Sequence, residues 1–310
     1  MIVKDPPVEI VDNFWMLGAN AYPIYLFKGQ DKGTIFEGGT GPMGPILQGQ
    51  VDELGIADDY VKQLVVTHAH PDHVMAVPML REMFSDVAVL ASEPAAKTLA
   101  AEKAVSFFCK MDDKLTCALI DAGMITEEQK RPPMAENQIA VDRVLKDGDV
   151  IEVDDGVSFE VLETPGHSDC SLSFHEPSRK ILIISDATGY YLPDEEFWWH
   201  CYFTDYGAYV ESIERLAGLN AEILCLSHNA VIQGADDVAA YLRATVDATK
   251  QCHQRIIDDT KSGKTPREIA ETLGSEVYQK TQLMPEDFFQ KNCSFLVKNS
   301  LRHEGIDVEK

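Results

Sequence analysis

The feature that most constrains this chain is the segment THAHPDH at residues 67–73, which follows the apolar stretch Val61–Thr67. Four side chains that can bind metal ions lie within six residues: His68, His70, Asp72 and His73. A tight loop between a strand and a helix can bring such side chains to one point, whereas neither regular element does so at this spacing. We predict that His68 and His70 share one ion and that Asp72 and His73 face a second. Imidazole and carboxylate ligands together suit zinc, iron or manganese, and the alternative is a polar loop without metal.

Three more candidate ligands follow later β-like stretches: His167 in TPGHSD, Asp186 in IISDA and His228 in LSHN. Functional sites in α/β folds assemble at strand ends, which is where these residues lie. Taken singly, His167 could cap a turn, Asp186 could cap a helix, and His228 could be a hydrogen-bonded core histidine. Together with the four residues of the loop, they complete a ligand set for two metal ions.

The order HxHxDH, PGH, SDA and a late SH resembles the ligand pattern of the metallo-β-lactamase superfamily, over about residues 8–232. This resemblance implies an α/β fold of the αββα type, in which two β-sheets pack face to face, helices cover the outside and metals bind at the sheet edge. It also implies how the ligands are shared. His68, His70 and His167 would hold the first metal ion, Asp72, His73 and His228 the second, and Asp186 would bridge the two.

The chain departs from the superfamily's usual pattern at several positions. The early strand-end turn usually carries Asp, where this chain has Glu37 followed by two glycines, and Met75 and Ala76 stand where glycines are usual after the HxHxDH stretch. Class B1 β-lactamases have a cysteine in place of Asp186, so we do not expect penicillin hydrolysis. Flavodiiron proteins have a glutamate in place of His70 and carry a flavodoxin domain, and this chain has neither feature.

A narrower resemblance covers about residues 185–232. The stretches SDATGYYLP and FTDYGAYVESIERLAGL are similar to the quinolone-signal response thioesterases of the same superfamily. Those proteins also carry helices around the entrance of the site and at the C-terminus. The C-terminal helical region of this chain also resembles the tail of the superfamily's winged-helix-bearing branch, some of whose members cut RNA.

Local sequence patterns predict a β-rich core that is interrupted and followed by helices. Helical periodicity replaces strand-like stretches from Glu93 to about Val144. After Gly234 the pattern is helical again, with a capping box at Thr265 and a last helix after Pro285. We therefore predict a catalytic domain over residues 1–234, with a helical insertion at about 93–144, and a C-terminal helical extension over residues 235–310 packed on it. The predicted strands include Tyr22–Lys28, Thr34–Glu37, Val61–Thr67 and Val87–Ala91, and strands return from Asp147.

The charge balance limits which partners the protein can have. With 27 Lys and Arg against 51 Asp and Glu, the formal net charge is −24, which disfavours nucleic acids because binding a polyanion requires clustered cations. No apolar run approaches the roughly 18 residues of a membrane span, and the N-terminus lacks the pattern of a signal peptide. Seven cysteines without a CxxC pair favour reduced thiols. We expect a cytoplasmic protein with a small-molecule substrate and no nucleic-acid or membrane partner, and a homodimer is one option for its assembly.

These observations predict a metal-dependent hydrolase with two divalent transition-metal ions, zinc first, with iron or manganese as alternatives. Metal coordination can lower the pKa of water to about 7 and so supply hydroxide at neutral pH. The hydroxide would attack the carbonyl of a small ester, thioester or lactone, with Asp72 passing the proton to the leaving group. Tyr190 or Tyr191 could donate a hydrogen bond to the substrate carbonyl, and aromatic packing is the alternative role for both.

The walls of the substrate pocket and the type of reaction both leave alternatives. The aromatic run Phe197–Trp199 could form a pocket wall or could pack in the core, and the helical insertion is a second candidate wall. A sulfur-dioxygenase-like oxidoreductase would use one iron ion instead of two. A phosphodiesterase or ribonuclease conflicts with the acidic charge, and a ligand-binding regulator would turn over no substrate.

Overall fold

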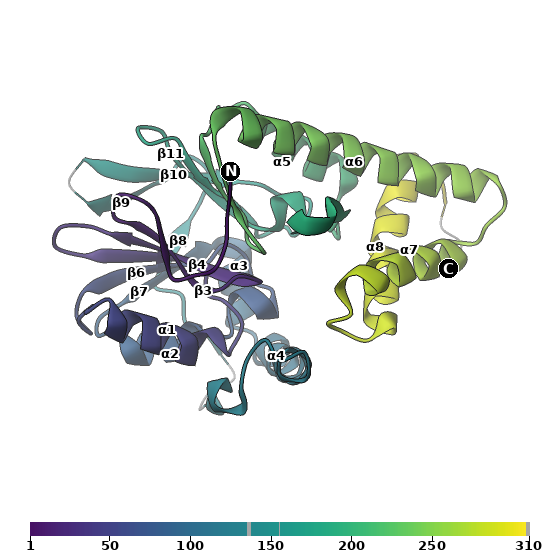
Figure 1. The fold of residues 1–310 in the computed structure, drawn as a ribbon. Coiled ribbons are helices and arrows are strands. Elements are labelled where there is room, and N and C mark those ends of the chain that lie inside the picture. The colour runs from purple at the N-terminus through teal and green to yellow at the C-terminus, as the bar shows by residue number, and fades with distance from the viewer. Residues whose placement is uncertain (135–137, 155, 308–310) are drawn as a thin grey trace.

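The computed structural model describes residues 1–134, 138–154 and 156–307 of the chain. Two seven-stranded mixed sheets pack face to face, and helices cover their outer faces (Figure 1). The αββα sandwich expected from the sequence is therefore confirmed. Within the described residues, no helix combines the length and the apolarity that crossing a bilayer requires.

The first sheet comes from the N-terminal half of the chain. In spatial order its strands are β2 (Val8–Val11), β3 (Phe14–Ala19), β4 (Tyr22–Lys28), β5 (Gly33–Phe36), β6 (Val61–Val65), β7 (Ala88–Ser92) and β8 (Arg143–Leu145). The strands from β2 to β5 pair antiparallel, whereas β5, β6, β7 and β8 are parallel neighbours. The C-terminal ends of β5 and β6 therefore open on the same edge of the sheet.

The second sheet combines the C-terminal half with the first residues of the chain. In spatial order its strands are β1 (Ile2–Val3), β16 (Val231–Gln233), β15 (Ile223–Cys225), β12 (Ile181–Ile183), β11 (Leu172–Glu176), β10 (Val157–Glu163) and β9 (Val150–Asp154). β12 and β15 run parallel, so their C-terminal ends also share an edge. A separate hairpin consists of β13 (Tyr190–Leu192) and β14 (Phe197–Trp199).

The sandwich core explains why several strands read as continuous apolar runs. On β4, Tyr25 and Phe27 belong to the core cluster between the sheets, whereas Ile24 and Leu26 belong to the cluster under the helices. Successive side chains of a strand point to opposite faces, and both faces of β4 are covered. In the core between the sheets, the ring of Phe159 from the second sheet packs against Phe36 of the first at a centroid distance of 4.7 Å.

The helices form two covering layers and a separate group beyond the sheets. The outer face of the first sheet carries α1 (Met43–Glu53), α2 (Val77–Met83) and α3 (Glu93–Leu99), and that of the second carries α5 (Tyr206–Ala217) and α6 (Ala235–Lys261). Beyond them lie α4 (Glu102–Asp121), α7 (Pro266–Thr281) and α8 (Glu286–His303). Figure 1 shows the α7 and α8 pair beside the half of α6 that extends past the sheets.

Most predicted elements are present; several strand boundaries shift by one or two residues, and one helical boundary differs more. The capping box at Thr265 begins α7 as expected, because the Thr265 hydroxyl accepts a hydrogen bond from the Glu268 amide and the Glu268 carboxylate accepts one from the Thr265 amide. The helical pattern expected to about residue 144 ends at Asp121, and Arg143–Leu145 instead forms β8 beside β7. A strand of three residues is too short to show alternation, so only its pairing with β7 defines it.

Candidate metal centre

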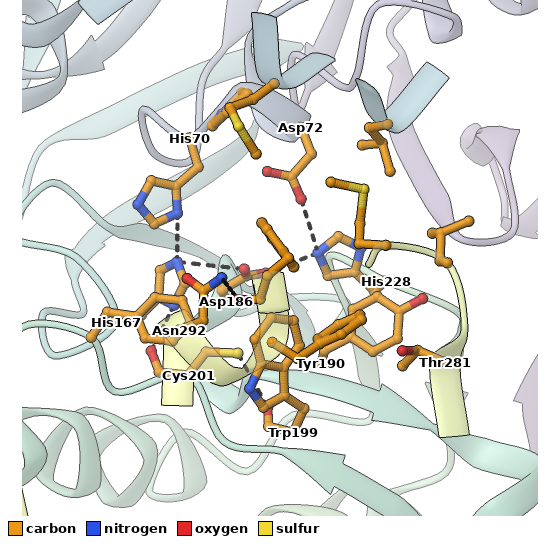
Figure 2. Close-up of a pocket in the computed structure, with 18 of the residues that line it drawn as sticks. His70, Asp72, His167, Asp186, Tyr190, Trp199, Cys201, His228, Thr281 and Asn292 are labelled. Carbon is orange, nitrogen blue, oxygen red and sulfur yellow. Dashed lines mark hydrogen bonds and ion pairs between the residues drawn. The ribbon is translucent and has the colours of Figure 1, made fainter. Parts of the chain in front are cut away.

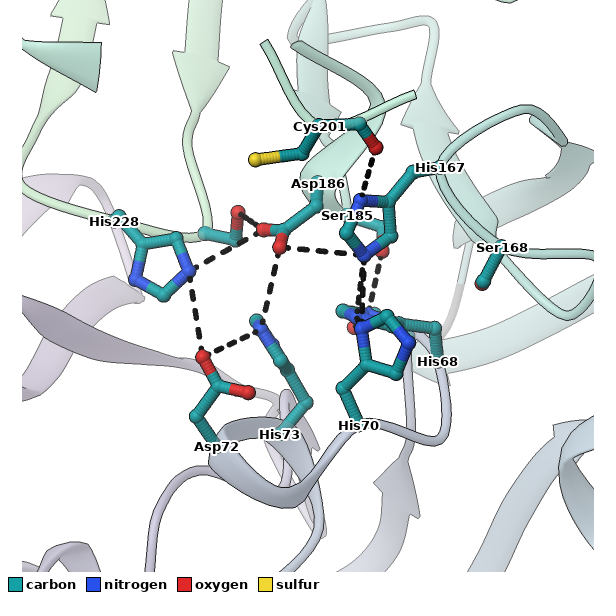
Figure 3. A network of polar contacts seen from close by, with 12 residues as sticks. His68, His70, Asp72, His73, His167, Ser168, Ser185, Asp186, Cys201 and His228 are labelled. Atoms are coloured by element: carbon teal, nitrogen blue, oxygen red, sulfur yellow. Dashed lines mark hydrogen bonds and ion pairs between the residues drawn. The ribbon is translucent and has the colours of Figure 1, made fainter. Parts of the chain in front are cut away.

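The predicted ligands come together from both sheets at one end of the sandwich (Figure 3). His68 follows β6, and the short 3-10 helix η1 (Pro71–His73) then turns the chain so that Asp72 and His73 face the same centre as His68 and His70. The second sheet supplies the remaining candidates from the loops that follow three of its strands. These are His167 after β10, Asp186 after β12 and His228 after β15.

The first group of converging atoms consists of three histidine nitrogens. His68 Nε2 lies 3.0 Å from His70 Nδ1 and 3.2 Å from His167 Nε2, and His70 Nδ1 lies 2.9 Å from His167 Nε2. A tetrahedral zinc ion with Zn–N bonds of 2.0–2.1 Å would place its ligand atoms about 3.3 Å apart. The triangle of nitrogens is therefore close to the size that one such ion requires, and these three residues could hold it.

The second group combines a carboxylate with two histidines. Asp72 Oδ2 lies 3.4 Å from His73 Nε2 and 3.8 Å from His228 Nε2. Asp186 stands between the two groups, because its Oδ2 is 3.4 Å from His167 Nε2 and 3.7 Å from His73 Nε2, while its Oδ1 is 3.3 Å from His228 Nε2. The structure thus brings all seven predicted ligands together in one cluster.

Outer hydrogen bonds fix which ring nitrogen faces the centre. Four of the five histidines turn Nε2 inward and use Nδ1 for a fixed partner, an arrangement that sets the tautomer of a metal-binding histidine. The partners are the Ser185 hydroxyl for His68 at 2.8 Å, the Glu37 carboxylate for His73 at 3.0 Å, the Cys201 carbonyl for His167 at 2.8 Å and the Ala21 carbonyl for His228 at 2.9 Å. Each inward nitrogen offers a lone pair to the centre once its ring is neutral. Burial is outweighed by Glu37 at His73 and by Asp186 at His228, so the pKa of both rings is raised, and a bound ion would displace a proton from each.

The chemistry of these donors fits cations. Burial, followed by the neighbouring His167, lowers the pKa of His70 to about 3, and burial with the neighbouring histidines holds the pKa of His68 well below its usual value. Both rings are therefore neutral and can bind a cation. Among the described residues, His73 Nε2 is buried without a hydrogen-bond partner, which is costly unless a bound ion satisfies it.

The two aspartates are ionised ligands at neutral pH. Burial opposes the charge of Asp72, but the His73 and His228 rings more than offset it, so that the pKa of this carboxyl lies below its usual range. The pKa of Asp186 is held well below its usual value in the same way, by His228, His73 and His167. Two carboxylates and five imidazoles are a donor set that suits zinc, iron or manganese.

Sequence reasoning noted Glu37 only as a departure from the usual pattern, and the structure gives it a role. Its carboxylate accepts hydrogen bonds from His73 Nδ1, from the Thr67 hydroxyl at 2.8 Å and from the Gly38 amide at 2.9 Å. Gly38 passes so close to the loop that an added Cβ would lie 2.5 Å from the carbonyl oxygen of His73. The only sequence signal for this role was the position of Glu37 directly after β5.

Two serines that sequence reasoning missed also support the centre. Ser185 holds His68, and the Ser227 hydroxyl donates a hydrogen bond of 2.5 Å to Asp186 Oδ1. Each serine precedes one predicted ligand by one residue and contacts another, and no spacing rule distinguishes such serines from other strand-end serines.

A cavity of about 460 Å³ opens directly beside the ligand cluster (Figure 2). His70, Asp72 and Asp186 form part of its wall, and the remainder is mostly aromatic and aliphatic. No Lys or Arg among the described residues lines it. The helices contribute Phe107, Phe108 and Met111 from α4 and Phe288, Phe289 and Phe295 from α8.

The β13–β14 hairpin separates the residues proposed as a pocket wall from those in the core. Tyr190 pairs with Trp199 across the hairpin, and both line the cavity. Tyr191 pairs with Trp198, and their rings instead pack together at 4.6 Å and against Tyr241. Of the aromatic run Phe197–Trp199, Trp199 lines the cavity. Trp198 faces the other side, because neighbouring strand residues alternate, and Phe197 is not part of the lining.

Two aromatic rings flank one of the histidines in the cavity. The ring of Tyr190 lies 4.8 Å from that of His228, and the ring of Tyr22 lies edge-on to His228 at 5.3 Å. Burial raises the pKa of both tyrosines, so their hydroxyls remain protonated donors. No sequence signal indicated Tyr22, which stands at the beginning of a buried strand.

Comparison with known proteins agrees with this arrangement. The family model described as the metallo-beta-lactamase superfamily matches residues 17–228. A linear primary-alkylsulfatase from Pseudomonas sp. is 23% identical over 238 residues, which cover 70% of this chain and 43% of that protein. An uncharacterized protein from Aquifex aeolicus is 32% identical over 131 residues, covering 42% of this chain and 51% of that one. The chain thus spans about half the length of these curated relatives, or less.

Solved structures share the fold. A metallo-beta-lactamase family protein from Thermus thermophilus superposes with a TM-score of 0.64 at 20% identity, covering 96% of this chain and 95% of that one. A subclass B3 metallo-beta-lactamase of Bradyrhizobium japonicum superposes with a TM-score of 0.57 at 14% identity, covering 84% and 97%. At such low identity these similarities concern the fold alone.

Proposed function

This chain belongs to the metallo-β-lactamase superfamily, and we propose that it is a two-metal hydrolase of a carboxylic ester or thioester with an apolar acyl group, a lactone being the cyclic case. The observation that carries the proposal is the cavity beside the ligand cluster, whose walls are largely aromatic and aliphatic. An acyl chain of a substrate held at the cluster would be buried there, at about 0.8 kcal/mol for each methylene group.

The ligand set assigns the residues that would hold the ions. His68, His70 and His167 would hold one ion, and Asp72, His73 and His228 the other, with Asp186 between them. When bound, such ions lower the pKa of water and polarise a carbonyl. The Asp72 side chain is 29% exposed and lines the cavity, so it is placed to accept the proton of the attacking water and to pass it to the leaving group.

In this proposal, Tyr190 would orient the substrate. Its hydroxyl keeps its proton and its ring packs on His228, so it can donate a hydrogen bond to the carbonyl oxygen as negative charge develops there. Tyr22 flanks the other side of the same histidine and would narrow the space in which the carbonyl can lie.

The lining of the cavity disfavours substrates with an anionic reacting group. A sulfate ester, as the name of the Pseudomonas relative suggests, or a phosphodiester would place negative charge beside Asp72 and Asp186. Two bound divalent ions would offset the charge of these carboxylates, but no Lys or Arg of the described lining adds to them, so the apolar lining favours an uncharged acyl group. A single-iron oxidoreductase would leave part of the seven-residue ligand set without a role.

A series of p-nitrophenyl esters from acetate to octanoate tests the proposal. For the wild-type protein, kcat/KM should rise with chain length, by up to roughly fourfold per methylene while the chain remains within the cavity. Trp199→Ala should flatten this rise and leave acetate hydrolysis much less affected, because Trp199 lines the cavity. Octyl sulfate and a bis-aryl phosphodiester should react more slowly than any of the esters.

Trp198→Ala is the matched control. Its indole donates to the Thr245 hydroxyl at 3.0 Å and packs on the other face of the hairpin, so this change should lower stability and leave the dependence on chain length intact. If the two tryptophan variants gave the same profile, or if the wild type preferred the phosphodiester, the proposal would be wrong.

A further inference from the structure

The two helices that border the cavity carry the same pattern of residues. In each helix a central phenylalanine has a lysine four residues before it and a lysine three residues after it. A second cation follows seven residues after the phenylalanine. Residues three or four apart lie on one face of a helix, so three cations surround one phenylalanine on each helix. The two sets are Lys103, Phe107, Lys110 and Lys114 in α4, and Lys291, Phe295, Lys298 and Arg302 in α8. We call the six cations the cationic rim.

The two phenylalanines place the cationic rim at the mouth of the cavity. Phe107 is 56% exposed and Phe295 is 46% exposed, yet both line the cavity. The pKa of Asp287 on α8 is lowered by its hydrogen bond with Lys291 and, more weakly, by Lys114 of α4.

Most of the cationic rim is not neutralised by the protein. All six side chains belong to exposed residues. Within the described residues, Lys291 is the one member that forms an ion pair, with Asp287 at 2.6 Å. Salt screens charges beyond about 8–10 Å, so an anion at the mouth would experience these nearby cations more strongly than the net charge of −24.

An apolar cavity behind a charged mouth fits an amphiphilic ligand. We propose that the cationic rim binds the phosphorylated leaving half of an acyl ester or thioester whose apolar acyl half fills the cavity. This inference rests on the proposed function. In the reaction, the oxygen of water bonds to the acyl carbon, the bond from that carbon to the leaving sulfur or oxygen breaks, and the leaving atom takes a proton. The phosphorylated thiol or alcohol would then depart from the mouth.

Binding of two thioethers, which cannot be hydrolysed, tests the proposal independently of catalysis. S-octyl-coenzyme A and S-octyl-N-acetylcysteamine share the octyl chain and the adjoining arm, and the first alone carries phosphates. By calorimetry, the wild-type protein should bind the coenzyme A thioether on the order of tenfold more tightly at low salt. That preference should shrink as salt is added, because exposed charges are screened.

Charge reversal on both helices should abolish the preference. In Lys110→Glu/Lys298→Glu the two affinities should converge, and helix propensity is nearly unchanged because Lys and Glu are similar helix formers. Lys146→Glu, an exposed lysine in the turn before β9, should keep the wild-type preference. Equal wild-type affinities, or a preference that survives the double reversal, would overturn the role of the rim. If the preference held while octanoyl thioesters were not hydrolysed by metal-loaded protein, the proposed function would fail instead.

Discussion

Within the metal centre, Glu37 shows how one residue outside the ligand set can organise it. Its φ of +88° is unusual for a residue with a side chain, and its carboxylate joins three donors, namely the His73 ring, the Thr67 hydroxyl and the Gly38 amide. Two of these donors belong to the loop that carries the ligands. Glu37 therefore fixes both the path of the loop and the orientation of His73.

We predict that Glu37→Ala weakens binding of one of the two metal ions by about 10–100-fold, because partners that orient metal-binding histidines have effects of this size. The protein is dialysed against a series of metal chelators of increasing affinity, and its metal content is then measured. Glu37→Ala should lose one metal ion per chain at a chelator affinity at which the wild-type protein still keeps both. Thr67→Val keeps the bond from Glu37 to His73 and should retain both ions. Parallel loss of both ions in Glu37→Ala would instead indicate general unfolding of the site.

The convergence of the seven candidate ligands could be predicted from the sequence because each stands in a distinctive stretch that follows a strand. Their supporting residues could not, since Ser185 and Ser227 have no spacing that separates them from other serines. The choice between Tyr190 and Tyr191 depended on the register of the β13–β14 hairpin. A one-residue difference along a strand exchanges the two faces, and nothing local in the sequence determined that register.

Among the elements, α4 is anchored to the early strand-end turn by the buried carboxylate of Asp112. Asp112 is fully buried and accepts hydrogen bonds from the Thr40 hydroxyl at 2.6 Å, from the Gly41 amide at 2.8 Å and from Arg131 Nε at 2.6 Å. Because the same helix supplies Phe107 to the cavity, this anchor positions one wall of the substrate site.

We predict that Asp112→Ala lowers the free energy of unfolding by about 3–5 kcal/mol, since it breaks a buried ion pair and leaves the Thr40 hydroxyl and the Gly41 amide unpaired, although Arg131 keeps its ion pair with Asp113. Urea unfolding measures the effect, and Asp112→Ala/Arg131→Met should recover much of the loss. Glu93→Ala removes the exposed partner of Lys97 and should cost less than about 1 kcal/mol. Similar losses in Asp112→Ala and Glu93→Ala would mean that the buried pair does not anchor the helix.

The sequence predicted helices and strands well where a hydrophobic pattern extends over many residues. It predicted them poorly where a short strand is defined only by its pairing with a neighbouring strand. β4 has the predicted bounds, and the helix that begins at Thr265 starts at its capping box. By contrast, β8 and the β13–β14 hairpin each use strands of three residues. Strands this short are stabilised by their neighbours and not by their own periodicity. The division into a catalytic domain and a C-terminal extension stays a prediction.

In the molecule as a whole, the metal centre lies where the two sheets meet. The first sheet supplies His68, His70, Asp72 and His73 through one loop, and the second supplies the other three ligands through separate strand ends. Ions bound there would connect the two sheets and stabilise the folded state, because ligands that bind only the folded chain shift the folding equilibrium. The cavity, in turn, needs α4 and α8 from distant parts of the sequence.

The number of metal ions per chain tests this arrangement most directly. Elemental analysis of protein purified without chelators should give close to two transition-metal ions per chain, because the seven converging donors exceed what one tetrahedral ion uses. Asp186→Ala removes the carboxylate between the two groups and should bring the value towards one. A wild-type value at or below one, unchanged when zinc, iron or manganese is supplied, would contradict a two-metal hydrolase.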